Sequence, residues 1–274
     1  MRELPAGSAL AVREVTVRFG GITALDGVSL EVARGEVLGV IGPNGAGKTT
    51  LFNVICGFVA PDSGGLFWQG TPLVKIRPER LASLGIARTL QGVGLFSSLT
   101  ALENVMIGAE RFRRAGLVSA LLGLPRSDRD ERALRDRALT SLSQVGCAQV
   151  AERLPGSLPY AMQKRVALAR ALVCEPQLLL LDEPAGGLDA AELSELAKLI
   201  DALGNTIAVM LVDHHMDLVT SVCDRVVVLD FGRVIAAGAP PEVRRDPSVL
   251  EAYLGREAAD SPEVTEAGVA DAGS

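Results

Sequence analysis

The chain has 274 residues, of which 48% are hydrophobic and 22% are charged, and it carries a formal net charge of −6. Its length fits a single α/β unit or a core with an inserted subdomain, and its apolar content excludes a wholly disordered chain. Its longest apolar runs, such as residues 207–212, are far shorter than the roughly 18 to 20 residues that cross a bilayer, so we predict no membrane-spanning segment.

The N-terminal part of the sequence predicts a short tail followed by strands. Residues 1–9 have no basic patch followed by an apolar block, so we expect a flexible N-terminus, no signal peptide and a cytoplasmic location. Alternating and apolar patterns predict strands at 12–18, 28–32 and 37–41. The third strand runs into a glycine-rich turn, and a helix is predicted over residues 49–56.

The C-terminal half combines short apolar runs with helical patterns. The runs predict strands that are buried on both faces, because they are almost continuously apolar. They lie at 178–181, 207–212 and 226–229, and helical patterns at about 160–173, 190–203 and 215–222 separate or follow them. This alternation predicts an α/β fold with a mostly parallel sheet covered by helices.

Residues 97–157 interrupt this alternation and predict an inserted helical subdomain. The segment has helical composition, no convincing strand and a series of arginines mixed with acidic residues. The basic members are Arg126, Arg129, Arg132, Arg135 and Arg137. Because the charges alternate in sign and no aromatic residues are interleaved, we interpret them as a solvated, salt-bridged helix face and expect no nucleic-acid partner.

The tail and the cysteines complete the composition. Residues 257–274 hold five acidic residues and no base, so the rest of the chain is close to neutral, and we expect residues 256–274 to form a disordered acidic tail. The four cysteines, at 56, 147, 174 and 223, are widely spaced in apolar contexts. We interpret them as reduced residues in or near the core rather than disulfide or zinc ligands.

A complete phosphate-binding motif follows the strand at 37–41. We call residues 42–49 the phosphate loop; it comprises Gly42, Pro43, Asn44, Gly45, Ala46, Gly47, Lys48 and Thr49, and Thr50 follows it. Glycines let successive backbone N–H groups face inward, and the next helix adds its positive N-terminal end. The motif predicts a P-loop NTPase core, with Lys48 at the β- and γ-phosphates of ATP and the Thr49 hydroxyl as a Mg²⁺ ligand.

Two acidic residues end the apolar run at 178–181. A charged residue at the carboxyl end of a parallel strand is costly to bury unless it faces a site, and this edge of such sheets binds ligands. We expect Asp182 to hold Mg²⁺ through water and Glu183 to act as general base toward the attacking water.

Together these motifs resemble the ATP-binding cassette (ABC) family over about residues 10–255. The resemblance implies an antiparallel N-terminal β-subdomain beside the core, and it implies further site residues. Gln91 matches the glutamine that touches Mg²⁺ and the attacking water, and Phe19 matches the aromatic residue that stacks on adenine. His214 matches the switch histidine at the γ-phosphate, and residues 185–189 look like the D-loop.

Within that family the chain looks most like ATP-binding subunits of branched-chain amino acid importers. The resemblance implies a peripheral subunit on the cytoplasmic face of the membrane. Its implied partners are permease subunits, a second cassette of the same or another chain, and, indirectly, a substrate-binding protein. Urea and amide importers share much of the pattern. A soluble ABC ATPase of DNA repair or translation and a regulatory ATP-binding module remain as alternatives.

The family signature, often Leu-Ser-Tyr-Gly-Gln in this subgroup, aligns with residues 158–162, and the chain departs from it. Pro159, Ala161 and Met162 replace the hydroxyl, the glycine and the glutamine. In the family this segment begins a helix that faces the γ-phosphate held by the partner cassette. The resemblance therefore implies a weakened signature beside intact residues of the phosphate loop.

The same resemblance implies that the inserted helices contact the permease. We expect the apolar docking residues to be Leu95, Phe96, Leu99 and Leu102. For each of them, a place in the core of the subdomain is the alternative.

Overall fold

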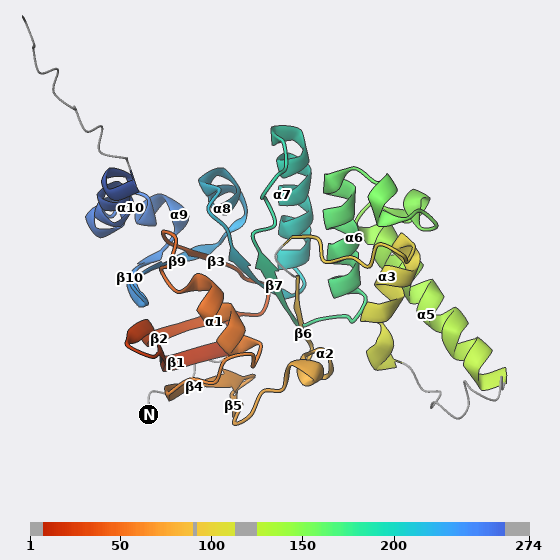
Figure 1. Ribbon diagram of the computed structural model, residues 1–274, viewed down its shortest axis with the longest axis horizontal. Coiled ribbons are helices and arrows are strands. Elements are labelled where there is room, and N and C mark those ends of the chain that lie inside the picture. The colour runs from red at the N-terminus through yellow and green to blue at the C-terminus, as the bar shows by residue number, and fades with distance from the viewer. Residues whose placement is uncertain (1–7, 90–91, 113–124, 261–274) are drawn as a thin grey trace, which may run out of the picture.

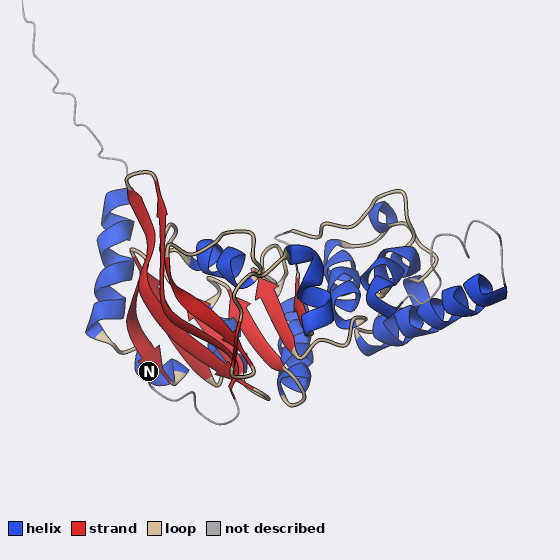
Figure 2. Ribbon diagram, turned by 90° about the horizontal axis from the view of Figure 1, so that it is seen from below, coloured by secondary structure: helices blue, strands red, loops and turns tan. Residues whose placement is uncertain are grey.

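The computed structural model describes residues 8–89, 92–112 and 125–260 (Figure 1). Within these ranges, no helix has the length and apolar character needed to cross a membrane. Strands gather toward one end of the molecule and a group of helices toward the other (Figure 2).

A six-stranded sheet forms the centre of the fold. Its order is β10-β9-β3-β8-β7-β6, and every neighbouring pair is parallel except β9 and β10. The strands are β3 (Val37–Ile41), β6 (Ile86–Arg88), β7 (Leu178–Asp182), β8 (Ala208–Val212), β9 (Arg225–Asp230) and β10 (Arg233–Gly238). The mostly parallel sheet predicted from the sequence is confirmed.

The continuous apolar runs reflect two cores, one on each face of this sheet. Leu178 and Leu180 of β7 lie in one core cluster, whereas Leu179 and Leu181 lie in the other. Successive side chains of a strand point to opposite faces, so a strand that is covered on both sides must be apolar at every position. Helices or the second sheet cover each face.

The second sheet is antiparallel and N-terminal, as expected. Its order is β2-β1-β4-β5, and the strands are β1 (Ser8–Phe19), β2 (Ile22–Ala33), β4 (Ser63–Trp68) and β5 (Thr71–Pro72). Helix α1 (Lys48–Ile55) lies between this sheet and the central one (Figure 1), and its Leu51 and Phe52 belong to the core cluster that both sheets share.

The helical region is built on α3 (Ala101–Gly108), α5 (Pro125–Gln144) and α6 (Tyr160–Leu172), which contact one another. The described part of 97–157 contains no strand, as predicted. Helix α3 begins with a capping box in which the Thr100 hydroxyl accepts from the Glu103 N–H. On α5, Arg135 pairs with Glu152 and Arg137 pairs with Glu175, which supports the salt-bridged helix face.

The remaining helices lie beside the sheets or the connections. They are α2 (Leu81–Leu84), α7 (Ala190–Gly204), α8 (Met216–Val222), α9 (Pro240–Val243) and α10 (Pro247–Asp260), with 3₁₀ turns at Pro78–Arg80, Glu110–Phe112, Ala148–Val150 and Pro155–Ser157. Helix α10 includes residues 256–260, which the sequence analysis assigned to the disordered tail. All four cysteines are buried and free, as expected.

Candidate functional site

Three adjacent strands carry the predicted site residues to one edge of the central sheet. Strands β3, β8 and β7 are parallel neighbours, so their carboxyl ends meet at the same edge. The phosphate loop follows β3, His214 follows β8, and Asp182 with Glu183 ends β7. Strand β6, next to β7, leads toward Gln91, which lies outside the described residues.

Backbone contacts fix the shape of the phosphate loop. Gly42 and Gly47 have φ angles of 148° and 104°, in the region that favours glycine. A Cβ atom on Gly42 would lie 2.1 Å from the Leu229 carbonyl oxygen, and one on Gly47 would lie 2.6 Å from the Ala24 carbonyl oxygen. The loop is therefore packed between β2 and β9, and only glycine fits at these two positions.

The side chains of the phosphate loop divide into buried and accessible ones. Pro43 and Ala46 are buried, whereas Asn44, Gly45 and Thr49 are exposed. The Lys48 Nζ atom donates to the carbonyl oxygens of Gly42 at 2.7 Å and Pro43 at 2.9 Å. The ammonium group thus lies over the loop itself.

A residue near the end of the described chain also reaches this loop. Burial raises the pKa of the Tyr253 hydroxyl on α10, and the backbone of Gly42 opposes this shift, so this side chain lies close to the start of the loop. No contact was predicted for Tyr253.

Asp182 is held in a buried ion pair. Its side chain is 4% exposed, and its Oδ2 atom lies 2.6 Å from Nη2 of Arg88, at the end of β6. The other terminal nitrogen of Arg88 donates to Oδ1 of Asn53 on α1 at 2.8 Å. This network joins the acid of β7 to β6 and to the helix after the phosphate loop. No spacing rule in the sequence identified Arg88.

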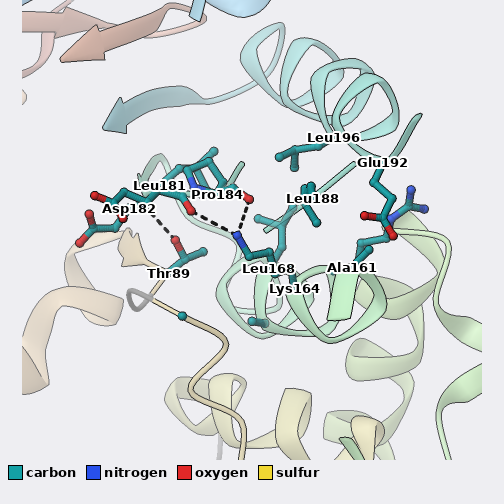
Figure 3. A pocket seen from close by; sticks show the side chains of 14 residues that line it. Thr89, Ala161, Lys164, Leu168, Leu181, Asp182, Pro184, Leu188, Glu192 and Leu196 are labelled. Atoms are coloured by element: carbon teal, nitrogen blue, oxygen red, sulfur yellow. Dashed lines mark hydrogen bonds between the residues drawn. The ribbon is translucent and has the colours of Figure 1, made fainter. Parts of the chain in front are cut away.

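Glu183 follows in a left-handed turn. Its φ angle is 48°, which is uncommon for a residue with a side chain, and its N–H donates to the Val212 carbonyl at 2.8 Å. The carbonyls of Glu183 and Pro184 accept from Nζ of Lys164, at 3.3 and 2.8 Å (Figure 3). Burial lowers the pKa of Lys164, and Asp213 and Glu183 oppose this shift.

His214 sits beside a buried carboxylate. Oδ1 of Asp213 accepts from the backbone N–H of His214 at 2.8 Å and contacts Nδ1 of His215 at 2.7 Å. Oδ2 of Asp213 accepts from the Ala185 N–H at 2.9 Å, which connects the histidine turn to the segment after Glu183. The His214 side chain is 60% exposed, so its ring is accessible at the sheet edge.

Phe19 stands on the hairpin beside the loop. It ends β1 and pairs with Ile22 of β2, the strand whose Ala24 carbonyl packs against Gly47. Its side chain is half exposed, which leaves the ring accessible for stacking.

The signature segment begins helix α6. Pro159 occupies the N-cap position and provides no side-chain hydrogen bond, and its carbonyl accepts from the Gln163 N–H at 3.0 Å. Met162 is half-buried and packs against the core cluster of the helical region. Tyr160 remains 43% exposed.

The predicted docking residues separate into two groups. Phe96 is 53% exposed, and Leu95 and Leu99 are half-buried. Leu102 is fully buried in the helical core, so the expectation that it docks a partner is wrong. It lies in the first turn of α3, a helix that contacts both α5 and α6.

Comparison with known proteins identifies the family. Residues 25–186 match the family model described as ABC transporter. The chain belongs to this family. Residues 233–259 of this ABC subunit also match the model described as branched-chain amino acid ATP-binding cassette transporter. The family resemblance and the ATPase activity that couples hydrolysis to transport are thereby confirmed.

Curated relatives include the high-affinity branched-chain amino acid transport ATP-binding proteins LivG of Salmonella typhimurium and BraF of Pseudomonas aeruginosa. They are 40% and 38% identical over 248 residues, which cover 90% of this chain and 97% of each relative.

Solved structures give the same fold. The ADP conformation of the cassette MJ1267 has a TM-score of 0.79 at 30% identity, covering 90% of this chain and 99% of that one. The dimeric bacterial ABC transporter cassette MJ0796 has a TM-score of 0.70 at 26% identity, covering 84% of this chain and 98% of that one. The predicted P-loop core with an antiparallel N-terminal sheet and inserted helices is confirmed.

Proposed function

We propose that this ABC subunit hydrolyses Mg-ATP to drive the uptake of branched-chain amino acids through a membrane permease. The observation that carries the proposal is the placement of the phosphate loop, His214 and the Asp182–Glu183 pair at the ends of three adjacent parallel strands. The solute class rests on the names of the relatives and on the match of residues 233–259.

ATP fits the loop by its backbone and its charge. Gly42 and Gly47 hold a turn whose backbone amides can cradle phosphate, and Lys48 supplies an ammonium at the same place. We assign residues 42–50 to phosphate binding and Phe19 to stacking on adenine.

Mg²⁺ fits the oxygen donors at the sheet edge. We assign Thr49, Asp182 and Gln91 to the ion, which would neutralise phosphate charge when bound. Arg88 holds one oxygen of Asp182 and so fixes the direction in which the carboxylate points.

Glu183 and His214 take the chemical roles. Glu183 accepts the proton of the attacking water as general base from its position directly after β7. His214, anchored by its backbone N–H to the buried Asp213, contacts the γ-phosphate with its exposed ring.

The partners follow from the family. The subunit pairs head to tail with a second cassette, and this pairing is supported by the similar cassette MJ0796, which is dimeric. It docks on permease subunits at the cytoplasmic face of the membrane. Leu95, Phe96 and Leu99 are the residues we assign to that docking surface. A substrate-binding protein acts indirectly through the permease, and no nucleic acid takes part.

Reconstitution tests the whole proposal. The subunit is purified with the proteins that co-purify from detergent-solubilised membranes and is placed in liposomes with their substrate-binding protein. We expect leucine, isoleucine or valine to stimulate ATP hydrolysis, and urea or amides to leave it unchanged. Co-purification of no membrane protein would instead favour a soluble ABC ATPase.

A further inference from the structure

The start of helix α6 is tied to the segment that follows β7. The Lys164 Nζ atom lies 2.8 Å from the Pro184 carbonyl oxygen and 3.3 Å from that of Glu183 (Figure 3). Lys164 is half-buried, so these hydrogen bonds are partly shielded from water. A charge-assisted hydrogen bond in such surroundings is stronger than one between neutral groups.

A second contact joins the same two segments. The Lys164 ammonium lies 5.3 Å from the centre of the Tyr160 ring, within the range of a cation–π interaction. A Cβ atom on Gly187 would lie 2.9 Å from Cε1 of Tyr160, so the ring packs directly on the turn after Glu183. Tyr160 and Lys164 are one helical turn apart and therefore share a face of α6.

Tyr160 and Lys164 contact a turn whose backbone is left-handed at Glu183. Glu183 has a φ angle of 48°, a conformation that carries strain in residues other than glycine and persists only where surrounding contacts enforce it. The Glu183 carbonyl has a second donor in Gly186 N–H, at 3.4 Å, which is long for a hydrogen bond. The N–H groups of Glu183 and Ala185 are held by the Val212 carbonyl and Asp213, and Lys164 ties the carbonyls of Glu183 and Pro184 to α6, most closely at Pro184.

We infer that Lys164 is a positioning residue that couples the signature helix to the general base of the same chain. The inference rests on the proposed function, in which α6 serves the site of the partner cassette and Glu183 serves its own. Through Lys164, a shift of α6 on contact with the partner's nucleotide displaces the backbone that carries Glu183, so the two sites of a dimer are linked within each chain.

Three variants test this role. Lys164→Met keeps the apolar stem and removes the ammonium, and Lys164→Arg keeps the charge as the conservative variant. Lys198→Met is the matched control, because Lys198 is exposed on α7 and its ion pair is with Glu195 of the same helix. For each protein we measure ATP affinity, kcat and KM of hydrolysis, and amide hydrogen exchange without nucleotide.

For Lys164→Met we expect kcat to fall about tenfold or more, the effect of losing a hydrogen bond to a charged group, with ATP affinity and KM within about twofold. Amide exchange should rise together at 158–162 and 183–187. Lys164→Arg should keep part of the wild-type kcat and part of the wild-type protection from exchange. Lys198→Met should match the wild type in both.

Two outcomes would overturn the inference. One is a wild-type kcat with unchanged exchange in Lys164→Met. The other is a parallel loss of ATP affinity, kcat and protection throughout the chain, which would show a merely structural role. A wild-type protein that does not hydrolyse ATP would refute the proposed function instead, and the exchange at the two segments would still decide whether Lys164 couples them.

Discussion

The phosphate loop and the signature segment are both regions that meet phosphate in the proposed dimer, but they are built differently. The loop keeps its full motif, and the backbone of β2 and β9 encloses it at Gly42 and Gly47. The signature segment, residues 158–162, departs at three positions from the signature that the resemblance implies, and two side chains of α6, Tyr160 and Lys164, pack on the turn after Glu183. In the proposed dimer, one chain would therefore contribute a complete half to one site and a reduced half to the other.

In a dimer with a different cassette that carries an ordinary signature, the two sites would therefore differ, whereas a dimer of two copies of this chain would have two identical sites. Pro159 removes a hydroxyl and an N–H from the start of α6, and Ala161 keeps its N–H but adds a methyl group. The positive end of the helix remains, while specific donors are lost.

The largest expected effects arise in the phosphate loop. Lys48→Ala should weaken ATP binding by about 100-fold or more, measured by equilibrium titration of a folded protein, because the phosphates lose an ammonium group. A Lys48→Ala protein with unchanged affinity would contradict the assignment of the loop.

Gly47→Val should lower the free energy of unfolding by about 3 kcal/mol or more, because the added Cβ would overlap the Ala24 carbonyl in a left-handed backbone.

The next effect separates ATP binding from ATP hydrolysis at the site that contains this chain's own phosphate loop. Glu183→Gln keeps the shape of the side chain and removes its basicity, so ATP should still bind while turnover falls by about 100-fold or more. Steady-state hydrolysis and nucleotide titration are measured on the same preparation. Turnover at the wild-type level would place the general base elsewhere and would favour the regulatory ATP-binding module.

A smaller effect, a gain in ATPase activity, is expected when the family's residues are restored in the signature segment. The triple variant Pro159→Ser, Ala161→Gly, Met162→Gln should hydrolyse ATP about tenfold faster than the wild type when each protein forms a homodimer. Each restored hydrogen bond to phosphate contributes about 1.5 to 3 kcal/mol. Part of this gain is lost because the space filled by Met162 must repack. The rates are compared at equal protein concentration. Equal and fast rates from both proteins would show that the helix end alone suffices.

The smallest expected effect concerns the buried thiol of Cys223. Burial, with Asp224 and Asp213, raises the pKa of Cys223 to about 12, and a Cβ on Gly39 of β3 would lie 2.9 Å from its Sγ atom. A thiol whose pKa is raised in the folded state favours folding below its unfolded pKa of about 9, and this contribution is lost as the pH rises toward 12.

Cys223 should therefore be alkylated more slowly than a free thiol at pH 8. The wild type should also lose stability between pH 8 and pH 10 because of this thiol, and a Cys223→Ala variant should lack that part of the loss. The measurements are iodoacetamide labelling with peptide analysis and thermal unfolding at the two pH values. Rapid labelling of Cys223 in the folded protein would show that the space behind β3 opens readily.

Much of the fold was predictable because the central strands are buried on both faces. The predicted strand at 37–41 matches β3, and the predictions at 178–181, 207–212 and 226–229 differ from β7, β8 and β9 by one residue at their ends. Four strands were not predicted: β4, which begins Ser-Gly-Gly, β5, which has two residues, β6, which has three, and β10. None of these segments is long or regular enough for its period to be recognised.

The site was predictable where a motif sets the spacing along the chain. The phosphate loop and the acids at 182 and 183 lie where strand ends place them. The contacts of Arg88, Lys164 and Tyr253 join segments far apart in sequence, and their residue types carry no pattern that identifies a partner. Leu102 was assigned wrongly because an apolar residue near a helix start fits a core and a docking surface equally.

The position of β3 in the sheet has a consequence for the synthesis of this protein. Both neighbours of β3, β8 and β9, come from the last third of the chain, so the strand that leads into the phosphate loop leaves the ribosome long before either of them. Until they arrive, β3 is an apolar strand with unpaired backbone N–H and C=O groups on both edges, which favour association with other nascent chains. Fragments that end before Ala208 should therefore aggregate, and ATP can bind to a finished loop only after synthesis has passed β9.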